Sequence, residues 1–268
     1  MYTLPQAQSP WDRFETNGFR CVAYSGDMRG RPDYFASVEI SRVAVADEPL
    51  SPEIYDVYRD RFRYAATPLD PREETTPVDH GDYIEHTVSI AAAYGDERFD
   101  IHLLLPTNAT PPYKASVFTP GINALSASTY QVLPWEEYTF IPKSGRAFAR
   151  PELAGMYKRG GGNGLFQMAQ SGSEMTRRMV LDVTRTVDYL DSREDIDLAD
   201  LGYIGFSFGA MLGPLFIGVE ERFAFAILTS GGLPMSAVVY RGESNPAAYI
   251  PGITKPVLMM NGRDDYVF

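Results

Sequence analysis

Cysteine and basic residues are both scarce in this chain of 268 residues. The single cysteine, Cys21, excludes an internal disulfide framework and fits a reducing compartment, so we expect a cytoplasmic protein. Lysine and arginine number 24 against 35 acidic residues, which gives a net charge of -11. Such a balance argues against a nucleic-acid partner, because binding a run of phosphates needs clustered cations. It also disfavours attachment to an anionic membrane surface.

Long apolar runs are missing as well. No stretch approaches the roughly 18 apolar residues of a membrane-spanning helix, and the first residues lack the basic and apolar regions of a signal peptide. The glycine-rich run at 160–164 lacks the Gly-Lys-Ser/Thr ending of a phosphate loop, so it forms either a flexible loop over a pocket or a plain linker. We expect neither a cofactor nor a bound metal. Hydrophobic residues still make up 44% of the chain, which is enough for one sizeable core.

The most informative motif lies at residues 205–209, which read Gly-Phe-Ser-Phe-Gly. This is the G-x-S-x-G pattern of a nucleophile elbow, with Ser207 at its centre. A mostly apolar run at 201–204 precedes it and suits a buried strand, and a run rich in small residues at 210–217 begins a helix. Strand, sharp turn and helix is the context in which this motif lifts a serine oxygen above a parallel sheet. The alternative is a glycine-rich turn that contains a serine by coincidence.

The rest of the chain alternates between strand and helix patterns. A hairpin is predicted over 83–105 around Gly95-Asp96, whose residue types suit a tight turn. Further strands are predicted at 115–118, 146–150, 224–228 and 257–260, and helices at 52–64 and 173–191. Strands that alternate with helical stretches indicate right-handed crossovers and a mostly parallel sheet, so we predict an α/β fold.

A serine nucleophile needs a general base, an acid to orient that base and donors for the oxyanion. The loop after the predicted buried strand 257–260 offers Asp264 and Asp265, and either carboxylate could reach the edge of the sheet where the elbow lies. For the oxyanion we predict the backbone amides of Phe208 and Ile122, with Gly121 permitting a close approach of backbone to substrate. Ordinary turns remain the alternative at both loops.

The general base is the missing part. The three histidines, His80, His86 and His102, all precede the elbow, whereas this fold places the histidine last in the order Ser, acid, His. We therefore expect His86 and His102 on strand faces and His80 in a loop. Glu152, Tyr157 and Lys158 follow a predicted strand, and they either line the mouth of a pocket or are ordinary surface residues.

From about residue 80 onward the chain resembles α/β-hydrolases of the dienelactone hydrolase, acetyl-xylan esterase and prolyl-oligopeptidase-like group. The matching segments are 118–124, 187–209 and 256–265. The resemblance implies a three-layer α/β-hydrolase fold, and its Gly-x-x-Asp spacing selects Asp265 rather than Asp264. Because the sequence stops three residues after Asp265, we expect a fold truncated at its C-terminus, with the histidine supplied after Phe268 in a longer parent protein.

Two shorter resemblances concern that parent. Residues 118–124, 134–136 and 143–146 resemble the hydrolase-like module of some large bacterial serine/threonine protein kinases. Residues 17–22 resemble the last strand of a formylglycine-generating-enzyme-like domain, which precedes the hydrolase in those kinases. The expected organisation is therefore a domain tail at 1–24, a linker with an amphipathic helix at 25–75 and an incomplete hydrolase domain at 76–268.

Two function classes stay open. The first is a serine hydrolase of carboxylic esters or related small acyl compounds, in which Ser207 attacks and Asp265 orients the histidine. The second is a non-catalytic sensing or interaction module of a multidomain kinase, whose partners are other domains of the same chain. The presence of both Ser207 and Asp265 favours the first class, and the absent histidine favours the second if the natural chain ends here.

Overall fold

The computed structural model describes residues 50–130, 138–232 and 242–262. The chain divides into two compact units, Met1–Val43 and Ala44–Phe268. Every described residue belongs to the second unit. Cys21, the expected domain tail at 1–24 and the candidate acid Asp265 therefore lie outside the described residues.

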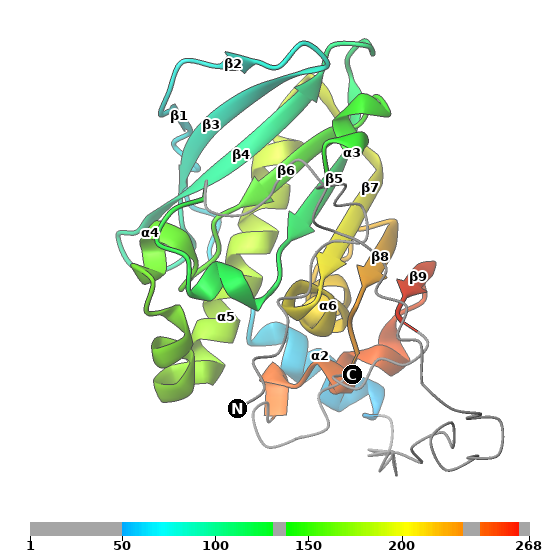
Figure 1. The fold of residues 1–268 in the computed structure, drawn as a ribbon. Coiled ribbons are helices and arrows are strands. Elements are labelled where there is room, and N and C mark those ends of the chain that lie inside the picture. Colours follow the sequence, from blue (N-terminus) through cyan, green and yellow to red (C-terminus); the bar gives the residue numbers. More distant parts are fainter. Residues whose placement is uncertain (1–49, 131–137, 233–241, 263–268) are drawn as a thin grey trace, which may run out of the picture. The chain divides into compact units, whose positions relative to one another are not determined.

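A nine-stranded sheet forms the centre of this unit, in the order β1-β3-β4-β6-β5-β7-β8-β9, with β2 paired to β3 (Figure 1). The strands are β1 (Arg72–Glu73), β2 (Val78–Asp79), β3 (Tyr83–Ala91), β4 (Arg98–Pro106), β5 (Tyr113–Thr119), β6 (Ala147–Pro151), β7 (Ile196–Phe206), β8 (Phe225–Thr229) and β9 (Val257–Met260). β3 and β4 form the predicted antiparallel hairpin, and β5 to β9 run parallel to one another. The five parallel strands therefore end at one edge of the sheet, where this class of fold places its sites.

Helices connect the parallel strands and cover the sheet. They are α2 (Pro52–Asp60), α3 (Phe140–Lys143), α4 (Tyr157–Gly160), α5 (Gly164–Asp191) and α6 (Phe208–Val219), with the 3-10 turns η2 (Ile122–Leu125), η5 (Gly242–Ser244) and η6 (Pro246–Gly252). Met179, Val183 and Val187 of α5 belong to the same core cluster as Val117 and Tyr203 of the sheet. The predicted helical spacing of apolar residues thus packs one helix face onto the sheet.

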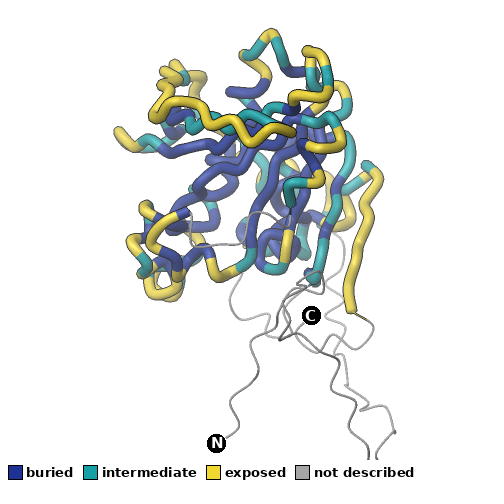
Figure 2. The backbone as a smooth tube through the Cα atoms, turned by 45° about the horizontal axis from the view of Figure 1, so that its top comes forward, coloured by how far each residue is buried: buried dark blue, intermediate teal, exposed yellow. Residues whose placement is uncertain are grey.

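A second, smaller core covers the opposite face of the sheet. Phe118, Phe148 and Ile204 of three neighbouring strands pack there against Ile141 of α3. The sheet therefore lies between the large helices α5 and α6 on one face and α3 on the other, and the central strands are dark, buried tubes in Figure 2.

The start of the second unit also packs onto this framework. Ser51 caps α2 by accepting a hydrogen bond from the Ile54 amide, and a proline occupies the first turn, where its missing N–H costs nothing. Tyr55 donates a hydrogen bond to the carbonyl of Gly218 in α6, and its ring lies 5.7 Å from that of Tyr249. No helix within residues 50–130, 138–232 and 242–262 is long and apolar enough to cross a membrane.

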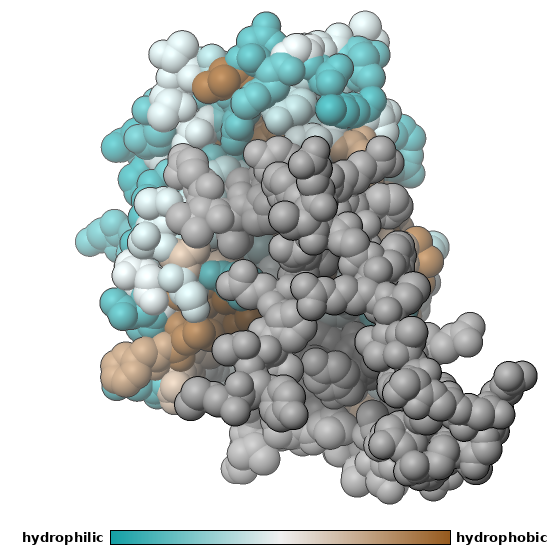
Figure 3. Space-filling model, viewed as in Figure 1, coloured by the Kyte–Doolittle hydropathy of each residue, from teal (hydrophilic) through white to brown (hydrophobic). Residues whose placement is uncertain are grey.

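The prediction that strand 257–260 is buried is wrong. β9 is at the edge of the sheet, and its side chains from Val257 to Met260 are 39–55% exposed. The apolar run predicts the strand correctly, but burial of β9 would need a further strand beside it. Among the described residues β9 pairs only with β8. Figure 3 shows another hydrophobic surface at lower left, where α5 begins in Figure 1 with the exposed side chains Leu165 and Phe166.

Candidate active site

The elbow forms where β7 ends and α6 begins, with Ser207 between them. Ser207 has φ +50° and ψ -109°, in the half of backbone space that L-residues other than glycine rarely occupy. Its amide donates to the Thr229 carbonyl at 2.9 Å, which ties the turn to the end of β8. The predicted strand, sharp turn and helix around G-x-S-x-G are therefore present.

Both glycines of the motif are required by close backbone contacts. A Cβ on Gly205 would lie 2.7 Å from the carbonyl group of Gly209. A Cβ on Gly209 would lie 2.2 Å from the carbonyl oxygen of Thr119, at the end of β5. The Gly209 amide also donates to the Pro120 carbonyl at 3.0 Å. The elbow and the loop after β5 are thus pressed together, which only residues without a side chain allow.

The predicted oxyanion donors lie on either side of this contact. Phe208 is the first residue of α6 and Ile122 is the first residue of η2, so neither amide has a carbonyl one turn earlier to bond. A Cβ on Gly121 would lie 3.4 Å from the Cβ of Ser207, so the backbone before Ile122 runs directly beside the nucleophile. The loop after β5 therefore runs beside the serine, and the role of the Phe208 and Ile122 amides as oxyanion donors stays a prediction.

A buried pair of hydroxyls beneath the elbow was not predicted. Tyr203 of β7 donates to the Gly209 carbonyl at 2.7 Å and also contacts the Thr119 hydroxyl. Both side chains are 0% exposed, and burial raises the pKa of Tyr203, so its hydroxyl keeps its proton. This bond fixes the end of β5 against the start of α6. No sequence signal pairs the two residues, because they lie 84 positions apart.

The described residues end at Gly262, three positions before the predicted acid Asp265. The Asn261 side chain, just after β9, accepts from the Gly231 amide at 3.1 Å and donates to the Gly231 carbonyl at 2.6 Å. The loop that leads to Asp265 therefore starts at the edge of the sheet where β7 and β8 end. Asp265 itself lies outside the described residues and stays a prediction.

None of the three histidines reaches the elbow. His80 follows β2 and stacks on Tyr83, while His86 lies on β3 and contacts Glu73 at 3.3 Å. His102 lies on β4, and two strands separate β4 from β7. At the usual strand spacing this amounts to about 14 Å between the two strands. The expectation that His86 and His102 lie on strand faces and His80 in a loop is confirmed.

His102 belongs instead to a buried polar cluster at the end of β6. Its Nε2 lies 3.0 Å from a carboxylate oxygen of Glu152, and its ring stacks on Tyr130 at 3.5 Å. Arg150 donates to Glu85 at 3.1 Å beside them. Glu152 and Tyr157 are only 3% and 1% exposed, so for these two both predictions, pocket mouth and ordinary surface, are wrong. The sequence shows their polarity but not the contact with His102 that accompanies the burial of Glu152.

The glycine-rich run 160–164 is a linker rather than a flexible loop over a pocket. It is a tight turn between α4 and α5, and a Cβ on Gly160 or Gly164 would lie 2.0 Å from the Gly155 carbonyl oxygen. This turn packs against the loop that follows β6, so it is fixed by backbone contact rather than free over a pocket.

Comparison with known proteins gives a consistent result at the level of structure. A scan against protein-family models finds no match, and a search of curated protein sequences finds none either. Among solved structures, acetyl xylan esterase 1 from a Thermoanaerobacterium strain is similar at 15% identity, with a TM-score of 0.59, over 79% of this chain and 78% of that one. An acetyl xylan esterase from a Paenibacillus species is similar at 15% identity and a TM-score of 0.55, over 79% of this chain and 87% of that one. A methylesterase is similar at 15% identity and a TM-score of 0.56, over 78% of this chain and 49% of that one. These likenesses, with the sheet order above, show that this part of the chain has the three-layer α/β-hydrolase fold.

Proposed function

We propose that this domain hydrolyses carboxylic esters or related acyl compounds through Ser207. The observation that carries the proposal is the strained backbone of Ser207, at φ +50°, held directly beside the backbone of Gly121. A serine in this conformation costs about 1–3 kcal/mol, and such strain persists where function requires a particular geometry. The structural likeness to esterases that act on acetyl and methyl esters supports the same reaction class.

In this mechanism the Ser207 hydroxyl attacks the ester carbonyl. The carbonyl oxygen becomes negatively charged, and the amides of Phe208 and Ile122 stabilise it. A histidine removes the serine proton and later returns it to the leaving alcohol, and Asp265 orients that histidine. Water then attacks the acyl-enzyme in a second step of the same kind, which releases the acid and regenerates the serine.

The histidine of this mechanism is not one of the three in the chain, because all three lie on or beside β3 and β4. In this fold the histidine follows the acid in sequence, so the proposed mechanism needs a histidine after Asp265. Without it the 268-residue chain retains the oxyanion donors and should turn over esters about 10³- to 10⁶-fold more slowly than a complete site. Since the base serves deacylation as well, an acyl group transferred to Ser207 should persist.

The proposal can be tested by detecting an acyl group that stays on Ser207. The purified chain is incubated with p-nitrophenyl acetate, and acetylated serines are identified by peptide mass spectrometry. We expect acetyl on Ser207 above the level on other serines. Ser230 is a matched control, since it has φ +48° at the end of the neighbouring strand, and Ser230→Ala should leave the labelling of Ser207 unchanged. Acetylation no higher at Ser207 than at other exposed serines would remove the basis of the proposal.

A second candidate is a sensing or interaction module that uses the hydrolase fold without catalysis. The position of all three histidines away from the elbow favours it. In that case Ser207 remains unlabelled, and extending the chain along its natural coding sequence restores no esterase activity. An extension that does restore Ser207-dependent hydrolysis favours the enzyme.

We also infer the setting of the domain from the sequence resemblance alone. On that basis residues 76–268 belong to the hydrolase-like module of a bacterial serine/threonine protein kinase, with a formylglycine-generating-enzyme-like tail at 1–24. Mass analysis of the endogenous protein, showing one polypeptide with kinase and hydrolase peptides, tests this arrangement.

A further inference from the structure

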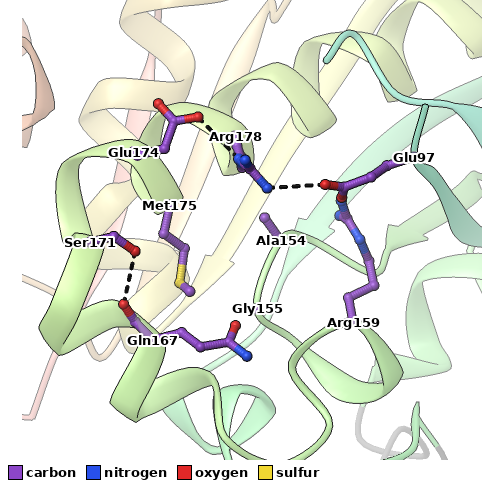
Figure 4. A pocket seen from close by; sticks show the side chains of 9 residues that line it. All are labelled: Glu97, Ala154, Gly155, Arg159, Gln167, Ser171, Glu174, Met175 and Arg178. Carbon is purple, nitrogen blue, oxygen red and sulfur yellow. Dashed lines mark hydrogen bonds and ion pairs between the residues drawn. The ribbon is translucent and has the colours of Figure 1, made fainter. Parts of the chain in front are cut away.

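A cavity of about 470 Å³ lies beside α5, away from the elbow (Figure 4). Its walls come from the β3–β4 turn, the loop after β6, α4 and the first half of α5, and none of the elbow residues 205–209 lines it. The volume is within the usual ~300–1,000 Å³ range of small-molecule sites. This space is therefore large enough for a ligand and independent of the proposed esterase chemistry.

The walls of the cavity are mainly polar, whereas most small-molecule sites are mainly apolar. Six of the nine lining residues carry hydrogen-bonding side chains: Glu97, Arg159, Gln167, Ser171, Glu174 and Arg178. Met175 and Ala154 provide a small apolar surface between them (Figure 4). A cavity of this composition favours a ligand with many hydrogen-bonding groups over an apolar one.

The charges on the walls are balanced and already paired. Arg178 donates to Glu174 and to Glu97, each at 3.0 Å, and Arg159 donates to Glu97 at 3.2 Å. Asp182, which is fully buried, accepts a further bond from Arg159 at 2.5 Å. A charged ligand would have to compete with these ion pairs, at a cost in lost charge-assisted hydrogen bonds. Balanced walls thus disfavour both anions and cations.

Paired groups still have hydrogen-bonding capacity for a neutral ligand. Arg178 uses Nε and Nη1 for its two ion pairs, and within the described part of the chain its Nη2 has no hydrogen-bond partner. Both carboxylate oxygens of Glu97 and one of Glu174 accept a hydrogen bond from these arginines. Each of these oxygens has a second lone pair that can accept a further bond. Donors and acceptors that alternate along one wall match hydroxyl groups, which donate and accept at once.

The helix that forms one wall is interrupted at the cavity. Ser171 has φ -142° and ψ 43° inside α5, and its hydroxyl donates to the Gln167 carbonyl at 3.1 Å. The break occurs at a Ser-Gly pair, Ser171-Gly172, a known cause of sharp helix kinks. Figure 4 shows Gln167, Ser171 and Glu174 on the bend that borders the cavity. The kink therefore gives the wall its concave shape.

We propose that this cavity binds a neutral, hydroxyl-rich ligand of about disaccharide size. Isothermal titration of the purified chain with cellobiose, maltose and xylobiose tests it, with glucuronate and glucosamine as charged comparators. We expect at least one neutral disaccharide to bind with a Kd on the order of 1 mM, tighter than either charged sugar. Ser207→Ala should bind equally well, so the result does not depend on the proposed esterase activity.

Two adjacent arginines provide the matched variants. Arg178 lines the cavity, whereas Arg177 pairs with the same Glu174, at 3.1 Å, without lining it. Arg178→Ala should weaken binding about tenfold and Arg177→Ala less than twofold, because only the first removes ligand-facing donors. Should Arg178→Ala unfold the protein, Ser171→Trp fills the rim from an exposed position and should abolish binding. The proposal is overturned by no neutral binding at about 10 mM, by equal weakening in both arginine variants, by tighter binding of a charged sugar or by unchanged binding in a folded Ser171→Trp.

Discussion

The hydroxyl pair beneath the elbow gives the sharpest test of how this fold holds its nucleophile. Tyr203 and Thr119 are both fully buried, and Tyr203 donates to the Gly209 carbonyl while it contacts the Thr119 hydroxyl. We predict that Tyr203→Phe and Thr119→Val each destabilise the protein, but that the double variant loses less than the sum.

The magnitude follows from which groups are left without partners. Tyr203→Phe leaves the Thr119 hydroxyl buried and deprived of its partner, and a group in that position costs about 1–3 kcal/mol. The Gly209 carbonyl is less affected, because it lies in the first turn of α6 and accepts the helical bond one turn later. Replacing both side chains by apolar groups of the same shape removes the unsatisfied hydroxyl, so the two losses should be coupled by about 1 kcal/mol.

Urea denaturation of the wild type, both single variants and the double variant measures this coupling through the free energy of unfolding. Tyr113→Phe is the matched control, because Tyr113 is half-buried on the same strand as Thr119 and its hydroxyl has no hydrogen-bond partner among the described residues. It should change stability by no more than about 0.5 kcal/mol. Losses from the two single variants that add to within about 0.3 kcal/mol would refute the reasoning.

Two further predictions concern the same core. Gly209→Ala should destabilise the protein by at least about 2 kcal/mol, since its Cβ would lie 2.2 Å from the Thr119 carbonyl oxygen, whereas Gly262→Ala, with no atom within 4 Å of its Cβ, should be neutral in the same thermal melt. At high pH the protein should unfold, because burial raises the pKa of several tyrosines, among them Tyr64, Tyr94, Tyr157, Tyr203 and Tyr249. Their stabilising effect is complete below the unfolded pKa near 10 and is lost above it, by about 1.4 kcal/mol per tyrosine at pH 11. Tyrosinate absorbance should therefore rise together with the loss of circular dichroism, and ionisation of most tyrosines in a folded protein would contradict this.

Local patterns in the sequence predicted the elements that position the elbow. The parallel strands β8 and β9 are short apolar runs beside turn residues, so their positions follow from the residues themselves, whereas β7 begins at Ile196, five residues before the predicted run 201–204. The start of α5 was missed, because the apolar spacing becomes regular only from Met179, while the helix begins at Gly164 and is broken at Ser171. Burial of β9 was also wrong, because an apolar run carries no information about which element covers it.

The candidate site was predictable in part for the same reason. Ser207 belongs to one motif and Gly121 to one loop, and the structure brings these two residues together. Contacts between residues far apart in sequence were not predictable, such as the Tyr203–Thr119 pair, the burial of Glu152 against His102 and the cavity beside α5. These depend on how strands are ordered in the sheet, which a single sequence does not determine residue by residue. The role of Asp265 stays a prediction.

The backbone of Ser207 allows a test of function that needs no substrate. A serine at φ +50° is strained by about 1–3 kcal/mol because its Cβ crowds the backbone, and glycine removes that strain while losing up to about 1 kcal/mol through its more flexible unfolded state. Ser207→Gly should therefore be more stable than wild type by about 1 kcal/mol in urea denaturation, whereas Ser207→Ala keeps the Cβ and should match wild type. Equal stability of the two variants would mean that the turn relaxes and stores no strain. A gain for glycine alone would mean that the fold retains a less stable residue at the position of the proposed nucleophile, which folding does not require and acyl transfer does.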